Sequence, residues 1–136
     1  MRKQWTRFEK PADIARELKA MQTLADLYGW SFKKLGEYDV DFYITGVGYL
    51  EVKGRLRNMS DAFPLPLAER KYKKLIEKPL NSIIVWGCLD GLIYADLSKI
   101  TFTKRYGGRT PRNGSSNDQE LMYFVSEQDA LVYVDY

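Results

Sequence analysis

The first third of the chain shows a helical and then a strand-like pattern of apolar residues. In residues 12–28 the apolar side chains recur every three or four positions and share one face of a helix: Ile14, Leu18, Met21, Leu24 and Ala25. Gly29 follows directly and gives a stop signal for that helix. In residues 30–35 aromatic and apolar side chains alternate with polar ones, which predicts a first strand.

Two further strand-like segments flank a glycine-rich tripeptide at residues 46–48 and predict a β-hairpin. A three-residue turn at this tripeptide places Tyr43 opposite Glu51 and Asp41 opposite Lys53. A two-residue turn would shift the pairing by one position and send Asp41 to the other face. The placement of Asp41 therefore depends on the length of this turn.

The rest of the chain predicts a second helix and several more strands. The helix is expected at residues 67–78, and the almost continuously apolar run at 81–89 predicts a strand covered on both faces. Further strands are expected at residues 92–95, 121–125 and 130–134. Polar, basic and glycine-rich residues at about 104–118 predict a mobile surface loop. We therefore expect one domain over residues 1–136, of the α/β or α+β class, with a mixed central sheet flanked by helices.

Composition limits the chemistry available to this chain. With 45% apolar and 29% charged residues, its 136 residues fit one folded, soluble domain. The single cysteine, Cys88, lies in an apolar run and is expected in the core, which favours a reducing, cytoplasmic setting. We expect neither a membrane span nor a secretory leader, because no apolar run is long enough for a span and the N-terminus leads into charged residues and not into a secretory hydrophobic region. The sequence contains no histidine, so catalysis would have to use carboxylates, lysines or tyrosines.

Charged residues of the hairpin are expected to gather on one face. Strand alternation sends Glu51 and Lys53 to that face and Val52 to the core, and Asp41 projects beside the charged pair in the register above. Two carboxylates are hard oxygen ligands suited to magnesium, which offsets phosphate charge and activates water. A lysine on the same face can orient the attacking water or stabilise the charge that develops on a phosphate. Asp39 shares the strand face and is an alternative ligand, but the hairpin pairing favours Asp41.

This arrangement of acidic residues resembles a known enzyme family. Asp41, followed ten positions later by Glu51-Val52-Lys53 in the order helix, strand, hairpin, helix, strand, resembles the PD-(D/E)XK nuclease superfamily over residues 12–95. The resemblance implies a restriction-endonuclease-like αβββαβ core and magnesium-dependent DNA cleavage, with manganese able to substitute. Val40 stands where many members of the superfamily have proline.

The same resemblance suggests further site residues. Some branches of the superfamily take a metal-site glutamate from the first helix, which falls on Glu17 here, and others place a lysine on the helix after the motif, which falls on Lys71. The implied metal set is then Glu17, Asp41, Glu51 and Val52. Glu17 and Lys71 are also compatible with ordinary solvated helix surface.

Several positive residues are candidates to contact DNA phosphates without reading the base sequence: Arg55, Arg57, Lys104, Arg105, Arg109 and Arg112. The net charge of +3 permits a nucleic-acid partner without establishing one. We expect a metal-dependent DNA nuclease, an endonuclease of DNA recombination, repair or the processing of phage and mobile-element DNA.

Two alternatives and the state of assembly stay open. A Holliday-junction resolvase is the runner-up within the same class. A noncatalytic nucleic-acid-binding module, which would keep Glu51 and Lys53 only as a surface ion pair, is the rival from another class. Paired cuts need two active sites, so a homodimer is attractive, although no sequence feature marks its interface.

Overall fold

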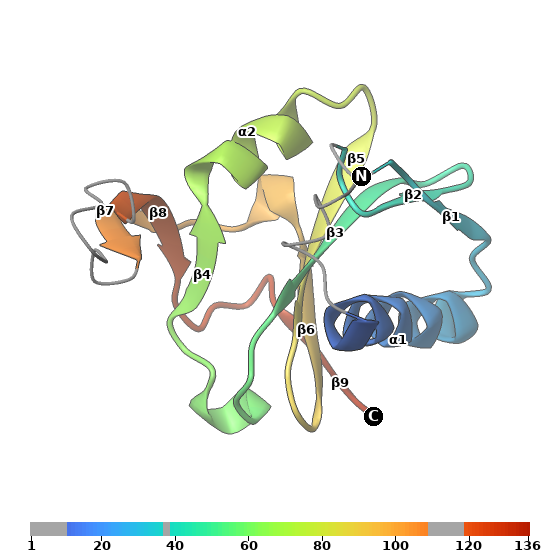
Figure 1. Cartoon of the computed structure of the whole chain (residues 1–136), viewed down its shortest axis with the longest axis horizontal. Helices are drawn as coiled ribbons and strands as arrows, with labels where there is room; N and C mark the ends of the chain where they lie inside the picture. The colour runs from blue at the N-terminus through green and yellow to red at the C-terminus, as the bar shows by residue number, and fades with distance from the viewer. Residues whose placement is uncertain (1–10, 37–38, 109–118) are drawn as a thin grey trace, which may run out of the picture.

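A six-stranded mixed sheet forms the centre of the protein (Figure 1). The computed structural model describes residues 11–36, 39–108 and 119–136. The strands of the large sheet lie in the order β1 (Phe32–Lys34), β2 (Phe42–Ile44), β3 (Gly48–Gly54), β5 (Asn81–Gly87), β6 (Gly91–Asp96) and β9 (Val132–Asp135). A three-stranded sheet has the order β4 (Leu65–Ala68), β8 (Gln119–Val125) and β7 (Thr103–Gly108). The helices are α1 (Pro11–Tyr28) and α2 (Glu69–Ile76), with short 3-10 turns at Met59–Asp61 and Leu97–Lys99.

The helix α1 covers one face of the large sheet (Figure 1). The second half of its predicted apolar stripe is buried there, together with one neighbour: Ala20, Met21, Leu24 and Ala25. The first half of the stripe, Ile14 and Leu18, stays exposed. Gly29 follows the helix with φ of 71°, the left-handed conformation that commonly ends a helix. None of the described helices is long and apolar enough to cross a membrane.

The opposite face of the large sheet is covered by α2 and the small sheet, which gives a layered α+β architecture (Figure 1). Leu75 from α2 and Leu65 and Leu67 from β4 pack in one buried cluster with the large sheet. The indole N–H of the fully buried Trp86 donates to the carbonyl of Pro66 at 2.8 Å. This hydrogen bond satisfies the buried indole and joins the two sheets.

The connection between β3 and β5 positions the candidate site. These strands are parallel, with Glu51 opposite Ile84 and Lys53 opposite Trp86. Parallel neighbours need a crossover connection, and here the chain passes through β4 and α2. Every residue of β5 except Asn81 is buried, which confirms the predicted strand covered on both faces. The predicted mixed sheet flanked by helices is confirmed, with β4 inserted between the hairpin and α2.

The second helix is shorter than the sequence predicts. It begins at Glu69, and the preceding residues form β4, in which Leu65 and Leu67 are buried while Pro66 and Ala68 are half-buried. A proline disfavours helical geometry in the residue before it, which keeps this segment extended. Pro66 fits in β4 because that strand lies at an edge of the small sheet.

The basic segment near residue 104 is also partly a strand, so the prediction of a loop over its first residues is wrong. Lys104 and Arg105 lie in β7, which pairs antiparallel with β8. In a sequence, polar side chains and glycines indicate a loop. An edge strand can nevertheless contain them when a neighbouring strand supplies its backbone hydrogen bonds. Arg109 and Arg112 lie outside the described residues.

Candidate metal centre between β2 and β3

The β2–β3 hairpin closes one residue earlier than predicted. The pairs are Ile44 with Gly48, Tyr43 with Tyr49 and Phe42 with Leu50, so the turn consists of residues 45–47. The predicted pairs of Tyr43 with Glu51 and Asp41 with Lys53 are therefore wrong by two positions. A shift of two residues keeps every side chain on its face, because side chains alternate with a period of two.

The glycines of this hairpin have different roles. Gly46, with φ of 75°, lies inside the turn. Gly48 lies in β3, where an added Cβ atom would come 2.1 Å from the carbonyl oxygen of Asn81. Gly48 is thus required by the close approach of β5, and counting it as a turn residue produced the wrong register.

Asp41 and Glu51 meet where the hairpin ladder ends. Beyond the pair of Phe42 with Leu50 the strands separate, and Asp41 extends the register to a position beside Glu51. The backbone N–H of Asp41 donates to Glu51 Oε1 at 3.2 Å, and Asp41 Oδ2 accepts from the backbone N–H of Val52 at 2.8 Å. Side chains therefore replace the backbone ladder at this point and fix both carboxylates.

Both carboxylates are buried, which is costly for two adjacent negative charges. Asp41 is 7% exposed and Glu51 is 5% exposed, and among the described residues the only other buried polar side chain is Ser82. Burial raises the pKa of Glu51, and the negative charge of Asp41 raises it further. The site therefore favours a cation beside these two groups.

Lysines from two different elements compensate this negative charge in part. Lys71 of α2 lies 3.1 Å from Glu51 Oε2, measured from its Nζ atom, and acts against the rise in the Glu51 pKa. Lys34 of β1 places its Nζ atom 3.4 Å from Asp41 Oδ1. The structure thus brings the predicted residue Lys71 into the site and adds Lys34. The pairing of β1 with β2 places Lys34 there, and no motif in the sequence marks it.

Glu17 approaches the pair indirectly. Its Oε1 atom lies 3.3 Å from the Nζ atom of Lys34, so the ammonium group of Lys34 stands between Glu17 and Asp41. Across the described parts of the chain, no three or more acidic, histidine or cysteine side chains are grouped so that they could hold a metal ion. The carboxylates that lie together are therefore Asp41 and Glu51.

Val52 contributes its backbone to the same gap. In a strand, the N–H and C=O groups of one residue point toward the same neighbouring strand. Since the N–H of Val52 donates to Asp41, its carbonyl oxygen also faces the gap between β2 and β3. A backbone carbonyl is a hard donor like a carboxylate, so Asp41, Glu51 and Val52 together form an oxygen-rich set suited to magnesium or manganese.

Asp39, the alternative metal ligand, is engaged elsewhere. Its Oδ1 atom lies 2.5 Å from Lys78 Nζ and accepts from the backbone N–H of Val40 at 2.7 Å. The hydrogen bond from Lys78 lowers the pKa of Asp39, and the hydrogen bond from Val40 adds to this effect. Asp39 is therefore a partner of Lys78, while Asp41 adjoins Glu51.

Lys53 lies on the same face of β3 as Glu51 but is exposed to solvent. Among the described residues it makes no hydrogen bond or ion pair. The ion-pair partner of Glu51 is Lys71. This arrangement disagrees with the alternative in which Glu51 and Lys53 form a surface ion pair, because Glu51 is buried and paired with a different lysine.

The candidate DNA-contacting residues have unequal surroundings. Arg55 donates from Nε to the carbonyl of Ala62 at 2.8 Å and therefore braces the loop after β3. Arg57 is exposed and pairs with Asp61 at 3.5 Å. Lys104 and Arg105 are exposed, and each lies over an aromatic ring of β8. Their charges stay accessible to a phosphate, while that of Arg55 is partly used within the fold.

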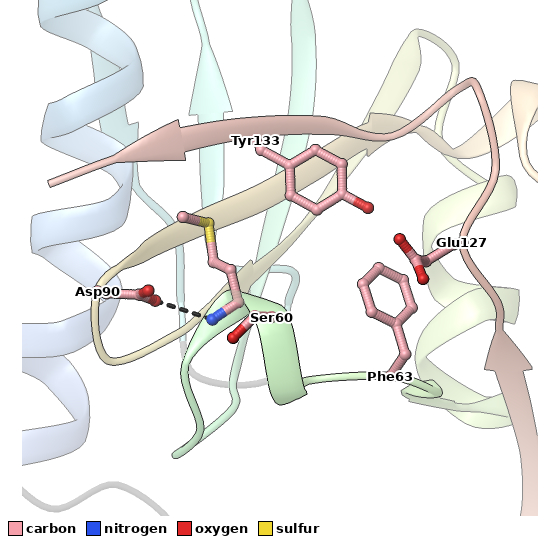
Figure 2. A pocket seen from close by; sticks show the side chains of 6 residues that line it. Ser60, Phe63, Asp90, Glu127 and Tyr133 are labelled. Carbon is pink, nitrogen blue, oxygen red and sulfur yellow. Dashed lines mark hydrogen bonds between the residues drawn. The ribbon is translucent and has the colours of Figure 1, made fainter.

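A hollow of about 320 Å³ lies away from this centre, between the loop after β3 and the β9 edge of the large sheet (Figure 2). Phe63 and Tyr133 form its aromatic sides, and Glu127 points between them (Figure 2). Asp90 accepts a hydrogen bond from the backbone N–H of Met59 at 2.8 Å. None of the described residues that line this hollow is a lysine or arginine. Its two carboxylates would repel phosphate, so it is unsuited to a nucleic-acid backbone.

Comparison with known proteins adds no assignment. No protein-family model, no curated protein and no solved structure matches this chain. The geometry of Asp41, Glu51 and their neighbours is therefore the basis on which a function can be inferred.

Proposed function

We propose that this protein is a metal-dependent DNA nuclease of the PD-(D/E)XK kind, a phosphodiester hydrolase. The observation that carries the proposal is the buried pair of Asp41 and Glu51, fixed side by side where the β2–β3 ladder ends. Two adjacent buried carboxylates lower the stability of a fold unless a cation offsets their charge. The presence of both carboxylates in one buried site is explained if they bind a metal ion.

The donor set fits magnesium, with manganese as a substitute. Asp41 and Glu51 would supply carboxylate oxygens, and Val52 would supply its carbonyl. A metal ion bound by these groups would offset phosphate charge and lower the pKa of a bound water. Asp41 is held by the N–H of Val52, so the protein fixes the orientation of its ligands before a metal arrives.

Two lysines are suited to assist the reaction. Lys53 shares the face of Glu51, and its exposed ammonium can approach a phosphate or the attacking water. Lys71 holds Glu51 in the absence of metal and would be free to contact substrate once Glu51 binds a cation. The ammonium group of Lys71 thus lies beside Glu51, the residue that would bind the metal.

DNA is the proposed substrate, and recombination, repair and the processing of phage or mobile-element DNA are the proposed settings. The basic residues of α2 and β7, among them Lys71, Lys104 and Arg105, support a polyanionic partner. No observation favours a Holliday-junction resolvase over other members of this class. A homodimer and a cytoplasmic setting remain parts of the proposal.

The proposal is tested by a cleavage panel with supercoiled, linear, single-stranded, flap and four-way-junction DNA, in magnesium, manganese and a chelator. Metal-dependent cleavage that Glu51→Gln abolishes is the expected result. Asp61→Asn is the matched control, because Asp61 is an exposed carboxylate whose ion-pair partner among the described residues is Arg57. A metal titration by calorimetry accompanies the panel. Absence of both metal binding at millimolar concentration and cleavage would overturn the proposal.

A further inference from the structure

A row of side chains borders the carboxylate pair on the α2 face of the large sheet. Strand pairing places Lys33 opposite Tyr43 and Tyr43 opposite Tyr49, so these three side chains cross β1, β2 and β3 in one line. The next residue along β3 on this face is Glu51, two positions after Tyr49, and the backbone N–H of Asp41 donates to its carboxylate. Side chains two positions apart on a strand share a face, so Tyr49 and Glu51 are separated by about 7 Å along β3.

This row forms the floor of a cleft of about 280 Å³. The rings of Tyr43 and Tyr49 lie with centroids 5.3 Å apart and are tilted by 53°. Both tyrosines are half-buried, so part of each ring faces the cleft. Leu35 and Leu80 add apolar walls, and Leu80 is 47% exposed. The cleft therefore presents flat aromatic and apolar surface to solvent beside a buried charged site.

The charges around this cleft are predominantly positive. Lys33 is exposed at one side, and Lys78 places its Nζ atom 4.9 Å from the centre of the Tyr49 ring. Asp39 also lines the cleft, but it is paired with Lys78. Two lysines and one aspartate leave an excess of one positive charge, which suits a ligand that combines an aromatic ring with a phosphate.

We propose that this cleft binds one unpaired nucleotide of the DNA substrate, next to the phosphate that is cleaved. The base would lie against Tyr43 and Tyr49, and Lys33 would contact a phosphate. The bases of an intact duplex are stacked inside the helix and cannot reach such rings without being flipped out. This inference rests on the proposed nuclease function and narrows its substrates to DNA with a single-stranded segment, such as a flap, an overhang or a branched junction.

The test compares the affinity of the full chain for a labelled oligothymidine and for a blunt duplex of equal length, by fluorescence anisotropy in metal-free buffer. Tyr43→Leu with Tyr49→Leu should weaken binding of the single strand at least about fivefold, because stacking on a protein aromatic ring stabilises a bound base. Binding of the duplex should change less than about twofold. Tyr43→Phe with Tyr49→Phe keeps both rings and should restore the single-strand affinity. Tyr133→Leu, on the β9 edge, is the control for loss of a half-exposed tyrosine.

A second variant keeps the inference testable if the leucine variants do not fold. Lys33→Gln changes an exposed residue and should lower the slope of log affinity against log salt by about 0.7 for the single strand. Unchanged single-strand affinity in folded tyrosine variants, an equal loss for the duplex, or an unchanged salt slope in Lys33→Gln would each overturn the inference. These outcomes are distinct from failure of the nuclease proposal, which is judged by metal-dependent cleavage in the unmodified protein.

Discussion

The backbone N–H of Asp41 donates to the carboxylate of Glu51 at 3.2 Å, although the two residues stand ten positions apart in the chain. Asp41 in turn accepts from the N–H of Val52, which directly follows Glu51. This reciprocal bonding holds the residue that precedes β2 against the middle of β3 without a backbone ladder. The polar groups that fix the strands are thus the same groups that would bind a metal, which couples local structure to the proposed chemistry.

The first prediction separates Asp41 from Asp39. Asp41→Asn should abolish metal-dependent cleavage, since it removes a charged ligand beside Glu51, whereas Asp39→Asn should retain cleavage within about threefold. Asp39→Asn should instead lower stability at neutral pH, because its pKa is lowered by Lys78. A carboxyl whose pKa is lowered in the folded state stabilises the fold above its unfolded pKa, and this contribution is lost as the pH falls through the lowered value.

Cleavage rates and urea unfolding at pH 7 and pH 3 check this pair of variants. Loss of cleavage in Asp39→Asn, with near-native rates in Asp41→Asn, would show that the wrong aspartate has been assigned.

The second prediction concerns Lys71. Lys71→Met should destabilise the metal-free protein by about 1–2 kcal/mol, because it leaves the buried Glu51 without its nearest cation. Lys73→Met is the matched control on the same helix, since Lys73 pairs with Glu69 at the surface, and its effect should stay within about 0.5 kcal/mol. Urea unfolding in the presence of a chelator measures both. Equal effects of the two substitutions would contradict the pairing of Lys71 with Glu51.

Much of the fold and the centre of the site could be predicted from the sequence. Helical spacing before Gly29 and strand alternation around Glu51 depend only on local residues, so α1, β3 and the shared face of Glu51 and Lys53 follow directly. The exchange of hydrogen bonds between Asp41 and its neighbours does not follow, since it depends on where the hairpin ladder stops. The predicted register is wrong because it assigns Gly48 to the turn. In a sequence, a glycine needed for close packing cannot be told from one needed for a turn.

The parts that the sequence did not predict depend on contacts between distant segments. Lys34 reaches Asp41 only because β1 pairs with β2 in one particular register. β7 exists as a strand because β8, at least eleven residues later in the chain, supplies its partner. The row of Lys33, Tyr43 and Tyr49 likewise needs three strands in fixed alignment. Composition alone gave no reason to assign Tyr43 and Tyr49 a role different from that of the other tyrosines in strands.

The third prediction addresses four basic residues, of which Lys104 and Arg105 lie on β7 at the edge of the small sheet. Alanine at Lys104, Arg105, Arg109 and Arg112 should weaken DNA binding and lower its salt dependence, because fewer counterions are released from the DNA. Lys104 and Arg105 are exposed on β7, so the fold should tolerate their replacement. Affinity for duplex DNA across a salt series is the measurement. A salt slope equal to that of the unmodified protein would exclude a role for these four residues in DNA binding.

The fourth prediction concerns Lys53. Lys53→Ala should lower the cleavage rate by a factor of about 100 or more, since it removes the cation proposed to stabilise charge in the reaction. Metal affinity and DNA affinity should change little, because Lys53 is exposed and is not a metal ligand. Single-turnover cleavage, calorimetry with manganese and DNA binding are measured together. Full activity in Lys53→Ala would remove this residue from the mechanism.

The last prediction concerns the charge of Glu51. Burial and the neighbouring Asp41 raise the pKa of Glu51 above its ordinary value of 4.5, so the folded state holds this proton more tightly than the unfolded state. The stability that this provides is present below about pH 4.5 and is lost as the pH rises through the higher folded value. In a chelator, Glu51→Gln should therefore become more stable relative to the unmodified protein between pH 4 and pH 7. In saturating magnesium the order should reverse, because only ionised Glu51 gains from metal binding. Urea unfolding under both conditions checks this, and a stability difference independent of pH and magnesium would mean that Glu51 is neither strained by burial nor a metal ligand.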